Sequence, residues 1–249
     1  MHIQSLVTPR IEAGQYELLN IIDQAVKTLE PNSVLAITSK IVSLCEGSVV
    51  PMAGTDKTEL MRRMSEQFVA DEHSKWGVHF TITNGMLIPT AGIDESNAGD
   101  VYVLWPRDAQ ETANQVRQHL TRRFGHGNAG VVITDSTVRP MRRGVSGIAL
   151  AYSGFKPLKN YVQSPDLFGR PFKVSQADIV GGLAGAAVLA MGEGAESTPL
   201  AVISDLTMVQ FVDRNPLPEE LRELTITLED DIFAPFLTKV RWQPGGQSQ

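Results

Sequence analysis

A carboxylate and a hydroxyl, Asp135 and Ser136, stand side by side directly after an apolar, β-branched run. Arg139, Arg142 and Arg143 follow within the next few residues. A carboxylate at a strand end with an adjacent hydroxyl suits Mg²⁺ or Mn²⁺, because these hard ions prefer oxygen ligands. Nearby arginines would bind phosphate oxygens through paired hydrogen bonds. A solvated loop whose arginines pair with acidic residues explains the stretch equally well, so both interpretations stay open.

Two further stretches carry carboxylates next to glycine. Asp94 and Asn97 lie three residues apart in the glycine-containing sequence TAGIDESN, which alone is more typical of a surface Asx-turn than of a ligand site. Glu193 is flanked by Gly192 and Gly194 at the end of a predicted helix. A carboxylate between glycines can approach an ion closely, but an ordinary helix C-cap accounts for the same pattern.

Other chemistries find little support. The sequence GHGNAG at 125–130 follows a predicted helix and precedes a strand, the reverse of the order in a dinucleotide-binding turn, so a helix C-cap is the simpler interpretation. No GxxxxGK[ST] sequence occurs, and the histidines lack the spacing of a zinc site. Cys45 is the single cysteine, with no histidine nearby, and is interpreted as a buried structural thiol.

Hydrophobic periodicity and turn residues predict the elements that must position these groups. Strands and helices mix without strict alternation, which favours an α+β fold with mixed sheets over a Rossmann sheet. Four small residues at 181, 182, 184 and 185 predict close packing of one helix against another backbone, in this or another subunit. We expect helices over 15–29, 58–69, 108–124, 175–191 and 218–225, strands over 34–38, 101–105, 131–134, 148–152 and 200–204, and a hairpin of 78–83 with 86–88 about Asn84-Gly85.

Composition bounds the class of protein. The 249 residues, 42% of them apolar, suffice for one large domain, which we expect over 1–249 with a weak subdomain boundary near 154–169. The net charge of −6 argues against a general nucleic-acid or anionic-membrane binder, so an anion site must be a local concentration of basic residues. Since the sequence shows neither a secretory signal nor a membrane-spanning stretch, we expect a cytoplasmic protein.

Taken together and in this order, five stretches resemble the coenzyme F420-0:L-glutamate ligase family of GTP-dependent γ-glutamyl ligases. No single stretch is decisive, but their order and spacing are specific, and the similarity runs from about residue 7 to about residue 206. The stretches are ITSKIVSLCEG (37–47), AGIDESN (91–97), ITDSTVRPMRRG (133–144), DLFGRPFKVS (166–175) and AAVLAMGEG (186–194).

The resemblance implies a set of site residues, carried over position by position. Asp94 and Asp135 match ligands of a first divalent ion, while Ser136 and Glu193 match ligands of a second. Arg139 is a candidate for phosphate or substrate carboxylates and joins Asp94 and Asp135 in the catalytic set. The positions that match nucleotide contacts are Pro9, Arg10, Ile11, Glu12, Ser39, Lys40 and Asn97.

The resemblance also implies the reaction and the assembly. Transfer of the nucleotide's γ-phosphate to an acceptor carboxylate would form an acyl phosphate, which the amine of L-glutamate then attacks. Two ions of Mg²⁺ or Mn²⁺, about 3.5–4 Å apart, would align and neutralise the phosphates, with GTP as co-substrate and room for K⁺. The family forms intertwined homodimers, so a homodimer that takes small-molecule substrates is expected.

Several positions depart from the family pattern and leave alternatives open. Leu44 stands where the family has a lysine that contacts the nucleotide, and Met141 replaces the tryptophan of the usual RPWR. Gly181 and Gly182 replace an acidic pair. The metal-binding positions match better than the nucleotide and acceptor surroundings. Folate polyglutamylation by the same chemistry is one alternative, and a non-catalytic relative that binds nucleotide or metal is the other.

Overall fold

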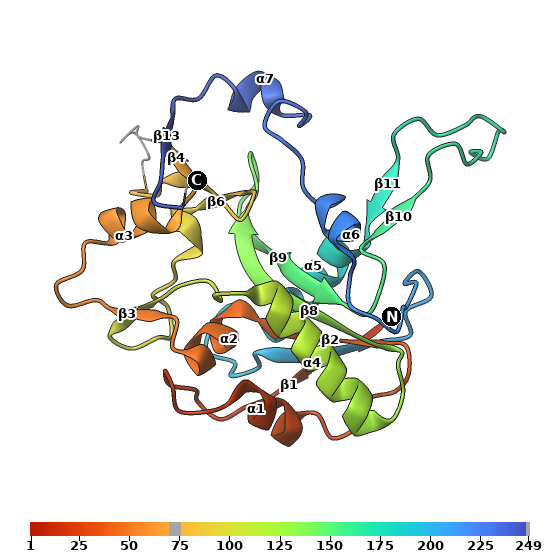
Figure 1. The fold of residues 1–249 in the computed structure, drawn as a ribbon, viewed down its shortest axis with the longest axis horizontal. Coiled ribbons are helices and arrows are strands. Elements are labelled where there is room, and N and C mark those ends of the chain that lie inside the picture. The colour runs from red at the N-terminus through yellow and green to blue at the C-terminus, as the bar shows by residue number, and fades with distance from the viewer. Residues whose placement is uncertain (70–75, 248–249) are drawn as a thin grey trace.

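A five-stranded mixed sheet forms the centre of the computed structural model, which describes residues 1–69 and 76–247 (Figure 1). Strands β2 and β8 run parallel, and every other neighbouring pair in this sheet is antiparallel. The mixed order confirms the α+β class. In spatial order the strands are β1 (His2–Leu6), β12 (Leu200–Ser204), β2 (Ser33–Thr38), β8 (Ala129–Val138) and β9 (Val145–Ser153).

Each face of this sheet is covered by helices, because its strands are apolar on both sides. On β2, Leu35 and Ile37 pack into one core cluster, while Val34 and Ala36 belong to the cluster on the opposite face. The first cluster includes residues of α1 (Leu18–Ala25), α2 (Ser39–Glu46) and α4 (Ala109–Phe124), and the second includes α5 (Ile179–Met191).

A smaller four-stranded sheet with the order β13-β4-β5-β6 carries its own apolar cluster. Its hairpin turns at Asn84 and Gly85, both with positive φ, as the Asn-Gly dipeptide predicts. The elements here are β4 (Gln67–Val69), β5 (Phe80–Thr83), β6 (Met86–Pro89) and β13 (Trp242–Pro244), with α3 (Lys57–Met64), the 3₁₀ turn η1 (Thr90–Gly92) and the separate pair β3 (Val49–Pro51) and β7 (Val101–Val103).

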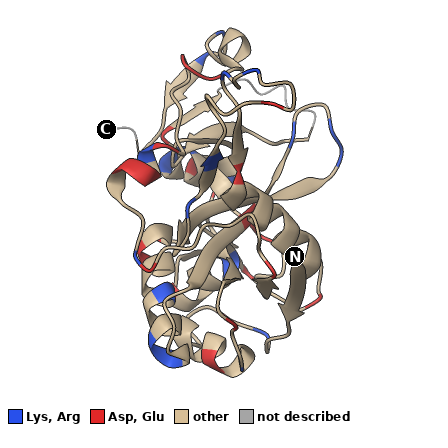
Figure 2. Cartoon of the chain, turned by 90° about the vertical axis from the view of Figure 1, so that its right-hand side faces the viewer, with Lys and Arg blue, Asp and Glu red and all other residues tan. Residues whose placement is uncertain are grey.

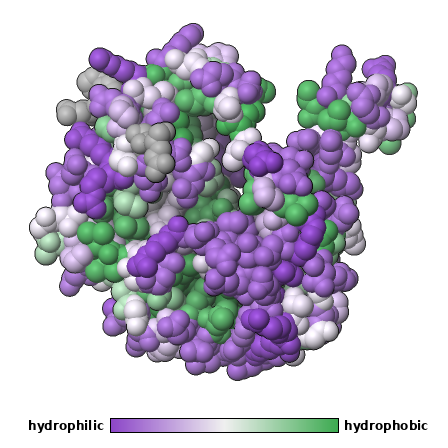
Figure 3. Space-filling view, in the orientation of Figure 1, coloured by the Kyte–Doolittle hydropathy of each residue, from purple (hydrophilic) through white to green (hydrophobic). Residues whose placement is uncertain are grey.

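An arm projects from the body between residues 158 and 178, as Figures 1 and 3 show. Its base is the antiparallel pair β10 (Leu158–Asn160) and β11 (Gln176–Asp178). Leu167, Phe168 and Val174 are almost fully exposed on it. The expected boundary at 154–169 falls on the first half of this arm, and the single-domain organisation stays a prediction.

Four element predictions need correction. The helix over 58–69 ends at Met64, because the chain then turns and Gln67–Val69 pairs with β5 instead. The late helix begins after Asp178, whose carboxylate accepts the N–H of Gly181 at 2.7 Å, since 176–178 pairs with β10. The helix over 15–29 spans only Leu18–Ala25, and helix α2 follows β2 where the sequence indicated only the end of a strand.

The small residues of α5 allow a close approach to β9. A Cβ built on Gly147 of β9 would lie 2.4 Å from the backbone carbonyl oxygen of Ala184. Gly147 also pairs with Ser136 across the sheet. The close packing predicted for this helix is therefore confirmed, and the backbone it meets belongs to the same chain.

Glu220 connects the C-terminal segment to Lys156, which lies just after β9. Its carboxylate is buried in α6 (Pro218–Arg222), and it accepts hydrogen bonds from Arg214 at 2.7 and 2.8 Å and from Leu217 N–H at 2.8 Å. Lys156 also donates to it. The bonds from Arg214, then those from Lys156 and Leu217, hold the pKa of Glu220 far below its ordinary value against the opposing effect of burial.

A Glu220→Gln variant should unfold more easily at neutral pH. Because the folded-state pKa lies below the unfolded value, the stabilisation is present above about pH 4.3 and fades as the pH falls below it. The partners are about a third exposed, so we expect a loss of about 2 kcal/mol in the free energy of unfolding at pH 7. Urea unfolding at pH 7, 5 and 3 checks this, and a difference between the proteins that grows toward pH 3 would contradict it.

Basic and acidic residues are interspersed along the ribbon in Figure 2. Among residues 1–69 and 76–247, no helix is both long and apolar enough to cross a membrane.

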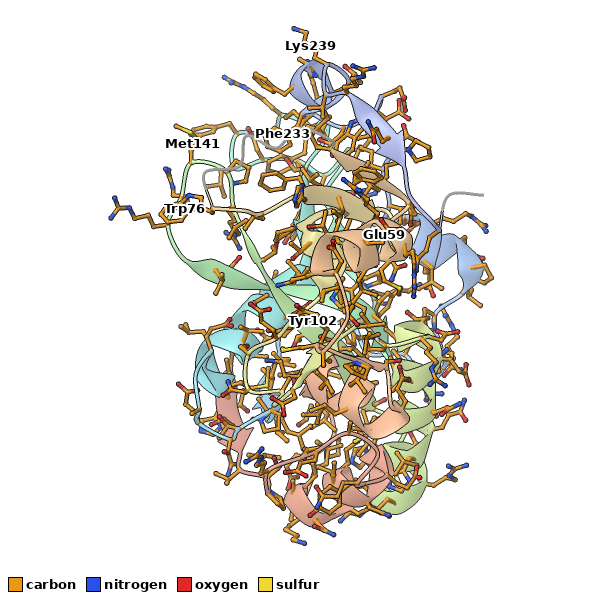
Figure 4. All side chains as sticks on the ribbon, turned by 90° about the vertical axis from the view of Figure 1, so that its left-hand side faces the viewer. Glu59, Trp76, Tyr102, Met141, Phe233 and Lys239 are labelled. Atoms are coloured by element: carbon orange, nitrogen blue, oxygen red, sulfur yellow. The ribbon has the colours of Figure 1, made fainter. Side chains whose placement is uncertain are left out.

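A further helix, α7 (Ala234–Leu237), lies in the C-terminal segment. Figure 4 shows Met141, which is 93% exposed, at the tip of the β8–β9 hairpin.

Candidate active site

One cavity of about 520 Å³ opens where β2 ends and α2 begins. Strand β8 passes Thr38, the last residue of β2, and continues with Asp135 and Ser136, so these two side chains lie beyond the end of their parallel neighbour. They were expected at the end of a strand; they lie within a longer one, after a shift of register between Ile133 and Thr134. The predicted residues that line the cavity are Pro9, Arg10, Ile11, Ser39, Lys40, Asp94, Asn97, Asp135, Ser136 and Glu193.

The carboxylate of Asp94 contacts a lysine and also accepts the hydrogen bonds of a local turn. Its Oδ2 lies 2.6 Å from Lys40 Nζ, and its Oδ1 accepts the backbone N–H of Ser96 at 2.7 Å and the Ser96 hydroxyl at 2.9 Å. Burial pushes its pKa up, but the bonds from Lys40 and Ser96 outweigh burial and lower it. The Asx-turn interpretation is therefore confirmed, and the same turn aims the Asp94 carboxylate at the cavity.

Asp135 is held by two donors. The indole N–H of Trp105 bonds to its Oδ2, and the backbone N–H of Ser136 bonds to its Oδ1 at 2.8 Å. Burial raises the pKa of Asp135 to about 6; the bonds from Trp105 and Ser136 oppose this rise, and the charge of Asp94 adds to it. Because the charge of Asp94 disfavours the charged form of Asp135, a cation between the two carboxylates would stabilise that form.

Glu193 reaches the cavity from the loop after α5. Its Oε2 accepts the hydroxyl of Ser136 at 3.2 Å. The loop is fixed by the Asn97 side-chain amide, which donates to Gly194 O at 2.9 Å, and by Gly194 N–H, which donates to Glu196 at 2.8 Å. Gly192 has φ of +82° and ends the helix, as predicted for a C-cap. The C-cap role and a position facing the cavity therefore coexist in one turn.

Two predicted residues are not among those lining the cavity. Glu12 pairs with Arg10 at 3.4 Å on the surface. Arg139 donates to the Ser146 hydroxyl at 2.9 Å within the β8–β9 hairpin, and Arg142 donates to Met141 O at 3.0 Å. In this chain the arginines thus lie on an exposed hairpin, and the carboxylate end of the stretch reaches the cavity without them.

The donors fit a hard divalent ion. They are carboxylate and hydroxyl oxygens, and Lys40 already brings one positive charge into contact with Asp94. Within the described ranges, no three His, Cys, Asp or Glu side chains gather closely enough to hold an ion by themselves. Mg²⁺ commonly takes one or two protein carboxylates and completes its shell with water and substrate phosphates. The residues present therefore fit an ion that takes a few protein oxygens and fills its other positions with water or with substrate phosphate.

Some residues of the site escaped sequence reasoning. Trp105 belongs to an apolar run that predicts only a buried strand, although a buried indole N–H needs an acceptor. Ser96 sits in the quoted turn, where its hydroxyl could have been paired with Asp94 as an Asx partner. No sequence pattern indicated a role for Glu196, apart from its position in a glycine-containing loop. Burial and the charges of Glu17 and Glu46 raise the pKa of Cys45 to about 11, which favours a protonated, structural thiol.

Comparison with known proteins identifies the relatives of this chain. The chain is 34% identical to the coenzyme F420:L-glutamate ligase of Methanopyrus kandleri over 82% of this chain and 86% of that protein. It is 28% identical to that of Methanococcus maripaludis strain C6 over 94% of this chain and 97% of that protein. The family model of F420-0:gamma-glutamyl ligase matches residues 5–205. The chain therefore belongs to the F420-0:gamma-glutamyl ligase family.

Proposed function

We propose that this chain joins the amine of L-glutamate to the carboxylate of an acceptor of the coenzyme F420-0 type, at the expense of a nucleoside triphosphate. The observation that carries the proposal is the meeting of Asp94, Asp135 and Glu193, distant in sequence, around one cavity. Family membership supports the same reaction, since the relatives bear the name coenzyme F420:L-glutamate ligase.

Charge in the cavity suits a nucleotide and its metal ions. Asp94, Asp135, Ser136 and Glu193 would hold two divalent ions, which when bound neutralise and align phosphate oxygens. The N-terminus of α2 also opens here, and no side chain caps it. Its free N–H groups, with Lys40 and Arg10, supply positive charge that attracts phosphate. Groups that suit cations and groups that suit phosphate therefore line the same cavity.

The proposed reaction has two steps. An oxygen of the acceptor carboxylate attacks the γ-phosphorus, the bond to the β-phosphate oxygen breaks, and an acyl phosphate and a nucleoside diphosphate form. The amine of glutamate then attacks the acyl carbon, phosphate leaves, and the amine loses a proton. Because both steps depend on alignment and charge neutralisation, no side-chain nucleophile is needed.

Leu44 supports testing more than one nucleotide. Its buried, apolar side chain lines the cavity and brings no charge to a phosphate. The test offers F420-0 or folate as acceptor, each with L-glutamate and either GTP or ATP, and follows phosphate release and product mass. We expect release that depends on F420-0, together with a product heavier by one glutamate residue. If only folate gives a product, the acceptor is folate and not F420-0. Nucleotide binding without phosphate release would indicate a non-catalytic relative.

We also propose a homodimer, on the basis of apolar residues that this single chain leaves exposed. Leu167 and Phe168 on the arm and Met141 on the β8–β9 hairpin are between 85% and 100% exposed. Burying each of them would contribute about 1.5–3 kcal/mol. Sedimentation at micromolar concentration should therefore give twice the chain mass, and a Leu167→Asp/Phe168→Asp variant should sediment closer to the monomer. A monomeric wild-type protein would contradict the proposal.

A further inference from the structure

Trp105 does more than fill the core. The side chain is 8% exposed, and its N–H bonds to Oδ2 of Asp135 rather than to a backbone carbonyl. Any apolar residue could occupy this buried position two residues after β7, but an indole brings a donor that must find an acceptor. Here the acceptor is a carboxylate that faces the cavity, so the indole and the site are directly linked.

The surroundings of the indole fix the direction of that N–H. A Cβ built on Gly92 would lie 2.2 Å from Trp105 Nε1, so only glycine leaves room for the ring edge at this point. Pro106 follows directly in sequence and restricts the backbone. A second cavity of about 290 Å³ is also lined by Trp105, together with Ala91 and Leu104. Because packing around the ring is incomplete, the Gly92 contact and the hydrogen bond set its position.

We infer that Trp105 is a positioning residue for Asp135. Its N–H occupies one carboxylate oxygen and holds the group in a single orientation, so that the remaining lone pairs face the cavity for a divalent ion. The inference rests on the proposed metal site. Outer-shell partners of metal-binding carboxylates typically change metal affinity by about 10–100-fold when removed, because the ligand loses its orientation.

The test compares two tryptophan variants. Trp105→Phe keeps an aromatic ring and removes the N–H. Trp242→Phe is the matched control, since the Trp242 indole N–H donates to Leu237 O at 3.0 Å and Trp242 is not among the residues that line either cavity. Mn²⁺ alone, with no nucleotide, is titrated into each protein while free Mn²⁺ is followed by electron paramagnetic resonance. We expect the dissociation constant to rise about 10–100-fold in Trp105→Phe and to stay unchanged in Trp242→Phe.

A second readout separates positioning from a merely structural role. The chain has three tryptophans, so a ¹⁵N-labelled protein gives three indole N–H signals, which the two variants help to assign. Mg²⁺ should move the Trp105 signal saturably, because the ion draws charge from the carboxylate that accepts the bond. If wild type binds the ions but the Trp105 signal stays still and Trp105→Phe binds equally well, the inference is wrong and the metal site stands. If wild type binds neither ion, the metal site falls, and the inference falls with it.

Discussion

Replacing Asp135 by asparagine should lower acceptor-dependent phosphate release by about a thousandfold or more, because the variant loses a negative charge where two ions would bind. The loss should appear in kcat, since the charge acts on the phosphoryl group during transfer. The fold should survive, because asparagine has nearly the same shape and keeps one oxygen for the N–H of Trp105, although it loses the bond from Ser136 N–H. Circular dichroism and the melting temperature check that the variant is folded.

A matched control is available at the other end of the sheet. Asp205 follows β12, is exposed, and has φ of +55°, a conformation that asparagine also tolerates. Asp205→Asn therefore removes the same charge from the same residue type without touching the cavity. We expect nearly full activity from it. Equal activity of Asp135→Asn and wild type would remove Asp135 from the catalytic set and leave Asp94 as the principal candidate.

The local turns that hold Asp94 and Glu193 could be predicted from short stretches, because each stretch contains its own turn residues. Asp94 lies in a turn that its own carboxylate closes, and Glu193 follows a helix that Gly192 ends, so local rules were sufficient. The pairing of Lys40 with Asp94 joins residues 54 positions apart, and only the folded sheet decides it. The resemblance predicts that Lys40 contacts the nucleotide, and the structure shows that Lys40 also contacts the carboxylate of Asp94.

Predictions failed where tertiary contacts outweighed local periodicity. Residues 58–69 show an apolar spacing that permits a helix, yet pairing with β5 gives Gln67–Val69 partners that a helix could not offer. Helix α2 was missed because its eight residues are few for a periodic signal, although Gly47 ends it in the left-handed conformation. The register of β2 against β8, which pairs Thr38 with Thr134 and so leaves Asp135 beyond the end of β2, depends on contacts between distant segments that local periodicity does not encode.

The contact between β9 and α5 affects both the stability of the fold and the position of Glu193. A substitution at this contact should therefore have a large effect. Gly147 lies opposite Ser136 on β9, and α5 leads through Gly192 to Glu193, which bonds to that same serine. A Cβ on Gly147 would lie 2.4 Å from Ala184 O and 2.7 Å from a methyl of Val188. The carbonyl is part of the helix backbone and cannot turn aside, so α5 would have to move as a body.

Gly147→Ala should therefore lower the free energy of unfolding by about 3 kcal/mol, the upper part of the range for overpacking. The fraction that folds should also lose ligase activity, because moving α5 separates Glu193 from Ser136. Gly182→Ala is the control within the helix itself. Gly182 is exposed and a Cβ there meets nothing within 4 Å, so alanine should raise the free energy of unfolding by about 0.5–1 kcal/mol. Urea unfolding of both variants measures the two changes in the free energy of unfolding. Stabilisation by both substitutions would show that α5 and β9 do not approach this closely.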